Sequence, residues 1–68
     1  MSTETTAAAL DRAREARDLL HDAADEAIRL AENGQHGEAL DVAAEAGREA
    51  TTLKKALQDV LIHAAGVA

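Results

Sequence analysis

The segment Asn33-Gly34-Gln35-His36-Gly37 divides the chain near its midpoint and separates two long stretches that contain no proline. Glycine adopts a left-handed backbone without strain, so Asn-Gly after a helical pattern marks a helix C-terminus. Both stretches are rich in helix-forming residues, alanine above all. The sequence therefore predicts one all-α domain over residues 1–68, a hairpin of two antiparallel helices. We expect the first helix over about 5–32, capped by Ser2 or Thr3, the turn over 33–37 and the second helix over about 37–65.

Apolar residues recur in both predicted helices at steps of three and four, as they do in a coiled coil. In the first helix this stripe consists of Ala9, Ala13, Ala16, Leu20, Ala23, Ala27 and Leu30. In the second helix it consists of Ala39, Ala43, Ala46, Ala50, Leu53, Leu57, Val60, Ala64 and Val67. When facing positions add to about 70, large residues meet small ones, as close packing requires. We expect Leu20 to face Ala50 and Ala13 to face Leu57.

A core built from these stripes is small, because the chain is alanine-rich and has no Phe, Tyr or Trp. The absence of cysteine excludes disulfides, so association with a further chain is the remaining way to enlarge the core. Two hairpins packed as a four-helix bundle cover most of the aliphatic side chains that one hairpin exposes. We therefore predict a homodimer or a higher helical oligomer that needs no cofactor. The expected self-association seam comprises Leu10, Ala13, Ala16, Leu20, Ala27, Leu30, Leu40, Ala43, Ala50, Leu53, Leu57, Val60 and Leu61.

The formal net charge of −6 argues against nucleic acid or an anionic membrane as a partner, since both bind clustered Lys and Arg. The same charge suits a basic partner protein. A candidate docking face for it consists of acidic residues at steps of three and four, namely Glu15, Asp18, Asp22, Asp25 and Glu26. The alternative is a solvated helix face, partly neutralised by the pairs Arg14–Asp18 and Asp25–Arg29.

Asp18 and His21 are weak candidates for metal binding, because a carboxylate and a histidine three positions apart recur in di-metal helical bundles. No other inward carboxylate completes such a site, and the alternative is a histidine on the flank of the helix. Catalysis is not expected, and we predict no catalytic residue. The chain has no Cys or Tyr, and its only serine is Ser2, so a serine or cysteine triad is excluded.

These observations predict a small non-enzymatic helical module for self-association or protein interaction, and regulation is one role open to it. Two alternatives stay open: an acidic, antitoxin-like neutraliser of a basic protein, and a ligand- or metal-binding helical bundle. No apolar run approaches the ~20 residues of a membrane span. The N-terminal residues lack a basic segment followed by an apolar one, as a signal peptide has. We therefore expect a cytoplasmic protein.

Overall fold

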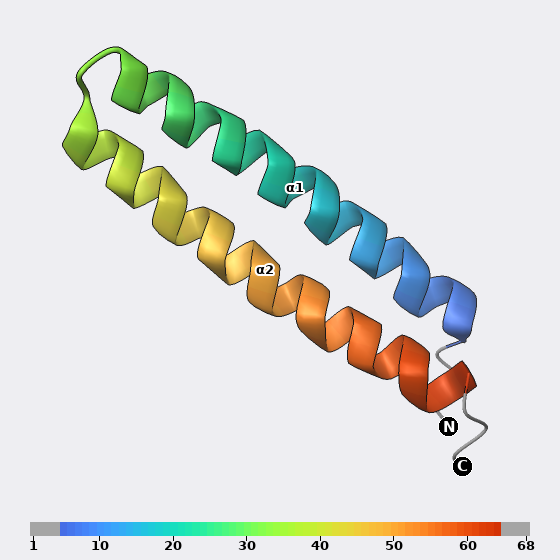
Figure 1. The fold of residues 1–68 in the computed structure, drawn as a ribbon. Coiled ribbons are helices and arrows are strands. Elements are labelled where there is room, and N and C mark those ends of the chain that lie inside the picture. The colour runs from blue at the N-terminus through green and yellow to red at the C-terminus, as the bar shows by residue number, and fades with distance from the viewer. Residues whose placement is uncertain (1–4, 65–68) are drawn as a thin grey trace.

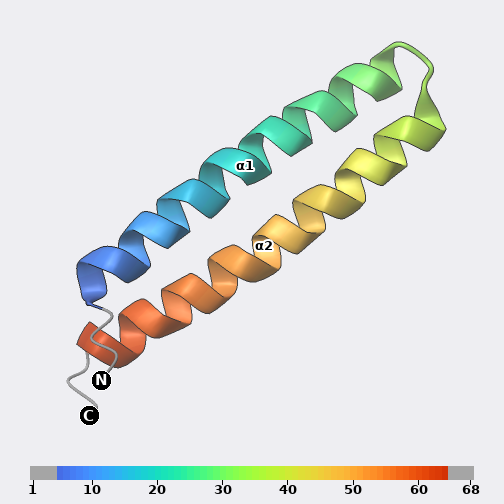
Figure 2. The same cartoon turned by 180° about the vertical axis from the view of Figure 1, so that it is seen from behind.

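The computed structural model describes residues 5–64, which form two α-helices joined by a short turn. Helix α1 spans Thr6–Glu32 and helix α2 spans His36–Ala64. The two helices lie side by side and run in opposite directions (Figure 1), and the view from behind in Figure 2 shows the same pairing. The predicted all-α hairpin is therefore confirmed. Its connection, residues 33–35, is shorter than the predicted turn over 33–37, because α2 already begins at His36.

Helix α1 begins directly after Thr5, which is its N-cap residue. The backbone of Thr5 is extended, and its side-chain oxygen accepts a hydrogen bond of 3.1 Å from the backbone N–H of Ala8. This bond satisfies one of the N–H groups that have no partner in the first turn of a helix. The expectation that Ser2 or Thr3 would cap the helix is therefore wrong, and both residues lie outside the described part of the chain.

The turn ends α1 in a Schellman motif. The N–H of Gly34 donates to the carbonyl of Ala31 at 3.0 Å, and the N–H of Gln35 donates to the carbonyl of Leu30 at 2.9 Å. Gly34 has a φ of +83°, a conformation that glycine adopts without a steric penalty. The helix C-terminus predicted at Asn33-Gly34 is confirmed.

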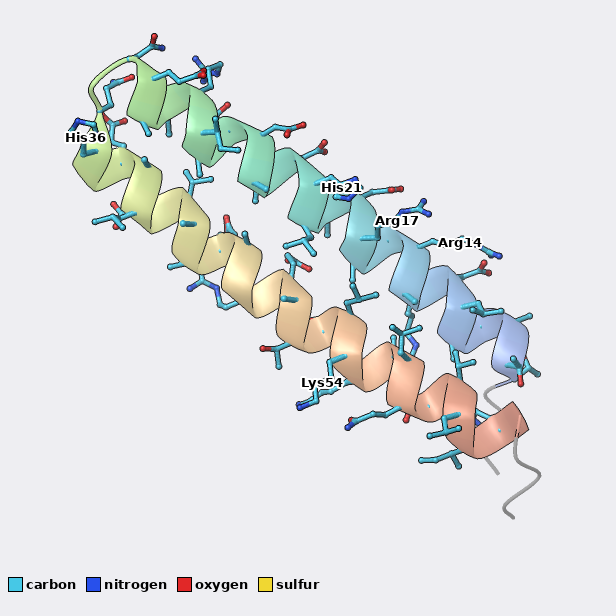
Figure 3. The ribbon with its side chains drawn as sticks, viewed as in Figure 1. Arg14, Arg17, His21, His36 and Lys54 are labelled. Carbon is cyan, nitrogen blue, oxygen red and sulfur yellow. The ribbon has the colours of Figure 1, made fainter. Side chains whose placement is uncertain are left out.

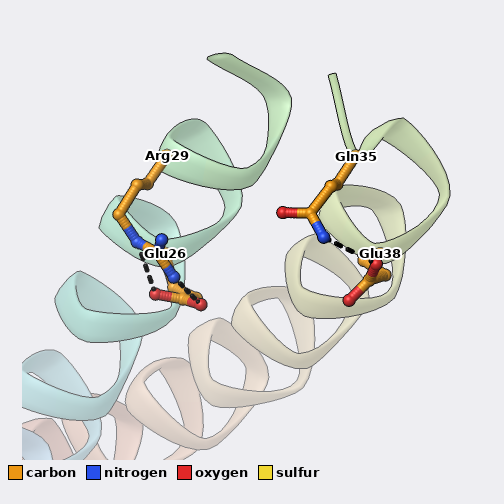
Figure 4. A network of polar contacts seen from close by, with 4 residues as sticks. All are labelled: Glu26, Arg29, Gln35 and Glu38. Carbon is orange, nitrogen blue, oxygen red and sulfur yellow. Dashed lines mark hydrogen bonds and ion pairs between the residues drawn. The ribbon is translucent and has the colours of Figure 1, made fainter. Parts of the chain in front are cut away.

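Gln35 ties the turn to the start of α2. Its carbonyl accepts a hydrogen bond of 2.9 Å from the N–H of Ala39. Its side-chain amide donates to a carboxylate oxygen of Glu38 at 3.0 Å (Figure 4). Glu38 lies in the first turn of α2, where the helix dipole favours a negative charge. Local hydrogen bonds on both sides of the turn therefore hold the hairpin closed at this end.

The face of α1 that packs on α2 is the predicted one. All residues of its predicted stripe are buried or half-buried, namely Ala9, Ala13, Ala16, Leu20, Ala23, Ala27 and Leu30. The stripe could be read from the sequence because the apolar residues of α1 occupy a single arc of the helix.

Helix α2 is rotated about its axis relative to the prediction. Apart from Asp59, its buried and half-buried positions follow the pattern Ala39, Val42, Ala46, Glu49, Leu53, Ala56 and Val60. The predicted stripe shares Ala39, Ala46, Leu53 and Val60 with this pattern. Its other members include Ala43, Ala50 and Leu57, which are exposed. The expected contacts of Leu20 with Ala50 and of Ala13 with Leu57 are therefore wrong. Of the other predicted members, Val67 and the side chain of Ala64 lie outside what the structure describes.

The rotation has a physical reason. Apolar residues surround much of α2, so their spacing alone is compatible with two neighbouring stripes, and the observed one includes the charged residue Glu49. The observed rotation instead buries Ala56, which is 1% exposed, beside the alanine-rich half of α1. Small side chains on both helices allow their axes to approach closely.

The axial register agrees with the prediction. A guanidinium nitrogen of Arg12 lies 3.0 Å from a carboxylate oxygen of Asp59, and this pair falls close to the predicted alignment of facing positions. Arg17 follows Arg12 by five positions, and Lys54 precedes Asp59 by five positions. Arg17 and Lys54 therefore lie at the same height along the antiparallel pair.

Candidate interaction surfaces

The hairpin exposes more large aliphatic side chains than it buries. Its buried apolar residues are five alanines and one leucine: Ala9, Ala13, Ala16, Leu30, Ala39 and Ala56. Its exposed large aliphatic residues are Leu19, Ile28, Leu40, Leu57, Leu61 and Ile62. Leu40 is the most exposed of them at 72%, followed by Leu61 at 68%. Such an arrangement is typical of a surface that another molecule covers.

Four of the exposed aliphatic residues lie on one side of the plane that contains both helix axes. Near the turn, a hollow on this side is lined by Ala27, Ile28, Ala31, His36, Ala39, Leu40 and Ala43. Further along α2, a second hollow is lined by Ala50, Leu53, Lys54, Leu57, Gln58 and Leu61. Residues seven positions apart share a side of a helix, so Leu40 and Leu61, three such steps apart, belong to one continuous surface.

The same side carries cations. Arg14 and His21 precede Ile28 by multiples of seven positions, and Arg17 precedes Ala31 in the same way. Figure 3 shows Arg14, Arg17 and His21 following one another along α1, with Lys54 on α2 and His36 at the turn. We call this surface the cationic flank; it comprises Arg14, Arg17, His21, Ile28, Ala31, His36, Leu40, Ala43, Gly47, Ala50, Lys54, Leu57 and Leu61. Within residues 5–63, none of the Asp and Glu residues lies on it, although the whole chain has thirteen.

Two ion pairs border the cationic flank. Arg14 pairs with Asp11 at 3.1 Å, and Arg17 pairs with Asp18 at 3.0 Å. The expected pair Arg14–Asp18 is therefore wrong, because the neighbouring guanidinium of Arg17 occupies Asp18. All four side chains are more than half exposed. Exposed pairs contribute about 0–1 kcal/mol, so both arginines are available to another carboxylate at little cost.

The opposite side of the hairpin carries carboxylates from both helices, and Arg29 and Arg48 pair with two of them, Glu26 and Glu45. A hollow there is lined by Leu19, Asp22, Ala23, Glu26, Val42, Glu45 and Glu49, and we call these residues the acidic flank. Its apolar members form an aliphatic floor, and each helix contributes two carboxylates. Glu49 is half-buried because it occupies an inward position of α2. Glu45 and Glu49 escaped the sequence analysis, which sought acidic clusters along one helix at a time; their spacing of four residues was the available signal.

The predicted acidic docking face does not form one cluster. Asp22 and Glu26 lie on the acidic flank, and Glu15, seven positions before Asp22, lies on the same side of α1. Asp18 and Asp25 instead follow the outer surface of α1, away from α2. Both carboxylate oxygens of Glu26 accept hydrogen bonds from the guanidinium of Arg29 (Figure 4). The expected pair Asp25–Arg29 is therefore wrong.

The predicted self-association seam is also divided. One group packs within the hairpin and consists of Ala13, Ala16, Leu20, Ala27, Leu30, Leu53 and Val60. A second group is exposed on the cationic flank and consists of Leu40, Ala43, Ala50, Leu57 and Leu61. Leu10 is half-buried. The second group is the part of the seam that is exposed to contact with another chain while the hairpin stays closed.

The candidate metal ligands lie on exposed surface, Asp18 on the outer side of α1 and His21 on the cationic flank. Within the described residues, no three His, Asp or Glu side chains come together in a way that could hold a metal ion. Over residues 5–64, neither helix has an apolar stretch of the length that crossing a membrane requires.

Comparison of the chain with known proteins finds no matching family model, no matching curated protein and no matching solved structure. The functional interpretation therefore depends on the two flanks.

Proposed function

We propose that this protein is a non-enzymatic self-association module, in which two hairpins stack face to face as a four-helix bundle. The observation that carries the proposal is the contrast between a core of alanines with Leu30 and the exposed leucines of the cationic flank. Burial of a large aliphatic side chain contributes about 1.5–3 kcal/mol. Covering Leu40, Leu57 and Leu61 therefore contributes on the order of 5 kcal/mol, as much as the whole net stability of many small domains.

The hairpin also offers enough area for a stable interface. Helix α2 has 29 residues, which gives a length of about 40 Å at 1.5 Å per residue. Two helices of about 10 Å diameter make a face about 20 Å wide, or on the order of 800 Å². A specific interface of standard size buries about that area on each partner. Face-to-face stacking of two hairpins therefore satisfies the size requirement of a homodimer.

The first test is light scattering on a size-exclusion column, combined with circular dichroism over a dilution series from about 100 μM to about 1 μM, because the stability of an oligomer depends on concentration. We expect a helical dimer or larger assembly whose melting temperature falls on dilution. Leu40→Ser and Leu61→Ser should shift the chain toward monomer. Ile62→Ser is the control, because Ile62 is an apolar residue that is 48% exposed but lies off the cationic flank. A stable helical monomer at every concentration would overturn the proposal.

The acidic flank favours a second candidate function, which is the binding of a basic partner protein. Four carboxylates around an aliphatic floor match a helix that carries lysines beside leucines. This function predicts that an amphipathic lysine-leucine peptide raises the melting temperature of the monomeric chain. Asp22→Asn combined with Glu45→Gln should remove most of that increase, and a melting temperature that the peptide does not change would reject this candidate.

A further inference from the structure

We infer that two copies of the chain meet through unlike flanks, with the cationic flank of one hairpin docked on the acidic flank of the next. The inference rests on the proposed self-association and specifies which surfaces come together. A pair formed in this way still contains four helices stacked as two layers.

Charge complementarity separates this arrangement from its alternatives. Stacking two cationic flanks would bring Arg14, Arg17 and Lys54 of both copies into one interface. The carboxylates that pair with the two arginines, Asp11 and Asp18, lie only at its border. Stacking two acidic flanks would bring together four carboxylates from each copy, of which Glu26 and Glu45 are paired with Arg29 and Arg48. Like charges that face each other across an interface disfavour it, whereas opposite charges steer the partners together and set their register. Docking unlike flanks places the cations of one copy against the carboxylates of the other.

The apolar surfaces of the two flanks are complementary as well. Leu40 and Leu61, the most exposed large aliphatic residues, belong to the cationic flank. The acidic flank has a hollow with an aliphatic floor and a rim of carboxylates. Docking unlike flanks therefore covers leucines with an aliphatic floor while the charged rims pair at the edges, as in most specific interfaces.

Gly47 is a residue that the hairpin itself does not explain. Glycine destabilises the interior of a helix, and a side chain added at Gly47 would have no atom within 4 Å. Gly47 is therefore not required for packing between α1 and α2. It lies midway between Leu40 and Lys54 on the cationic flank, where the lack of a side chain lets a helix of another copy approach α2.

Glu49 is a second such residue, on the other flank. It occupies an inward position of α2, where the neighbouring stripe residues are apolar, and it is half-buried. An aliphatic side chain there would enlarge the small core. Residues that disagree with the local requirements of a fold are typical of functional positions. Gly47 and Glu49 thus lie on the two surfaces that the inference brings together, Gly47 on the cationic flank and Glu49 on the acidic flank.

Each copy carries both flanks, so one contact leaves an acidic and a cationic flank free. Such heterologous assemblies either close into a ring or continue to grow. We therefore expect growth beyond two chains as the concentration rises, and weaker association at high salt, because salt screens the charged rims.

The test uses two charge-reversal variants that disable one flank each. The first is Arg17→Glu/Lys54→Glu on the cationic flank, and the second is Asp22→Lys/Glu45→Lys on the acidic flank. All four side chains are exposed, and circular dichroism verifies that the hairpin still folds. By sedimentation, each variant alone should associate at least about tenfold more weakly than the wild type. An equimolar mixture should recover association with both variants in a 1:1 ratio, because one supplies an intact cationic flank and the other an intact acidic flank.

The control Asp25→Lys/Glu32→Lys changes the net charge as the second variant does, but on the outer surface of α1; it should associate like the wild type. If the wild type assembles and the acidic-flank variant assembles equally well alone, like flanks meet, and the inference is wrong while the proposed function stands. If the wild type is monomeric throughout, the proposed function is wrong. A monomeric wild type that binds phosphatidylserine vesicles through Lys54 would assign the cationic flank to a lipid surface and overturn both.

Discussion

The guanidinium group of Arg12 lies 3.0 Å from the carboxylate of Asp59, and this ion pair links α1 to α2 across 47 positions of the sequence. It lies toward the end of the hairpin opposite the turn, where no covalent connection holds the helices together. Both side chains are nearly half exposed, at 46% and 41%. The pair therefore aligns the two helices but is open to solvent.

The first prediction concerns the strength of this ion pair. Asp59→Asn should lower the free energy of unfolding by less than about 1 kcal/mol, because solvent screens an exposed pair. The measurement is urea denaturation of Asp59→Asn, Arg12→Gln and the double variant, at a concentration where the chain is monomeric. The double-mutant cycle isolates the interaction between the two side chains. A coupling energy above about 2 kcal/mol would contradict solvent screening of the pair.

The second prediction tests the rotation of α2. Ala56→Leu should lower the free energy of unfolding by about 1–3 kcal/mol, because a larger side chain overpacks the contact between the helices. Ala44→Leu is the matched control on the exposed side of the same helix, and it should change stability by less than about 0.5 kcal/mol. Urea denaturation of both variants provides the measurement. Equal tolerance of leucine at the two positions would show that Ala56 does not face α1.

Ala56 and its neighbour Leu57 also show how far the sequence determines the fold. The hairpin is predictable because its signals are local: Asn33-Gly34 ends a helix, and long stretches of helix-forming residues flank the turn. The inward stripe of α1 is predictable because its apolar residues occupy one arc. The inward stripe of α2 is not, because Ala56 and Leu57 are both apolar, and only packing against α1 decides which of them is buried.

The third prediction compares two glycines that differ in backbone conformation. Gly47→Ala should raise the free energy of unfolding of the monomer by about 0.5–1 kcal/mol, since alanine favours helix and has open space there. Gly34→Ala should lower it by about 1 kcal/mol or more, because a φ of +83° is unfavourable for a residue with a side chain. Thermal unfolding under monomeric conditions measures both effects. Destabilisation by Gly47→Ala would mean that a neighbouring group already fills this space.

The two flanks were harder to predict than the fold, because each combines residues from both helices. The seven-residue spacing of Arg14, His21 and Ile28 is visible in the sequence, as is that of Lys54 and Leu61. Their joining into one surface depends on the rotation of α2, which the sequence left undetermined. The acidic flank was missed for the same reason, since half of its carboxylates come from the helix whose rotation was predicted wrongly.

The last prediction concerns Glu49, where stability and association should change in opposite directions. Glu49→Leu should raise the free energy of unfolding of the monomer by about 1 kcal/mol, because it adds apolar area at an inward position. The same substitution should weaken self-association, because it removes a carboxylate from the acidic flank. Urea denaturation of the monomer and sedimentation at higher concentration measure the two effects separately.

Glu49→Gln is the control that separates charge from shape. It retains the size of the side chain, so stability should change by less than about 0.5 kcal/mol, while association weakens as it does for Glu49→Leu. Destabilisation by Glu49→Leu would show that position 49 does not face α1. Unchanged association in both variants would show that the carboxylate does not contribute to the contact between copies. Only a more stable monomer that associates less fits a carboxylate that serves the assembly rather than the hairpin.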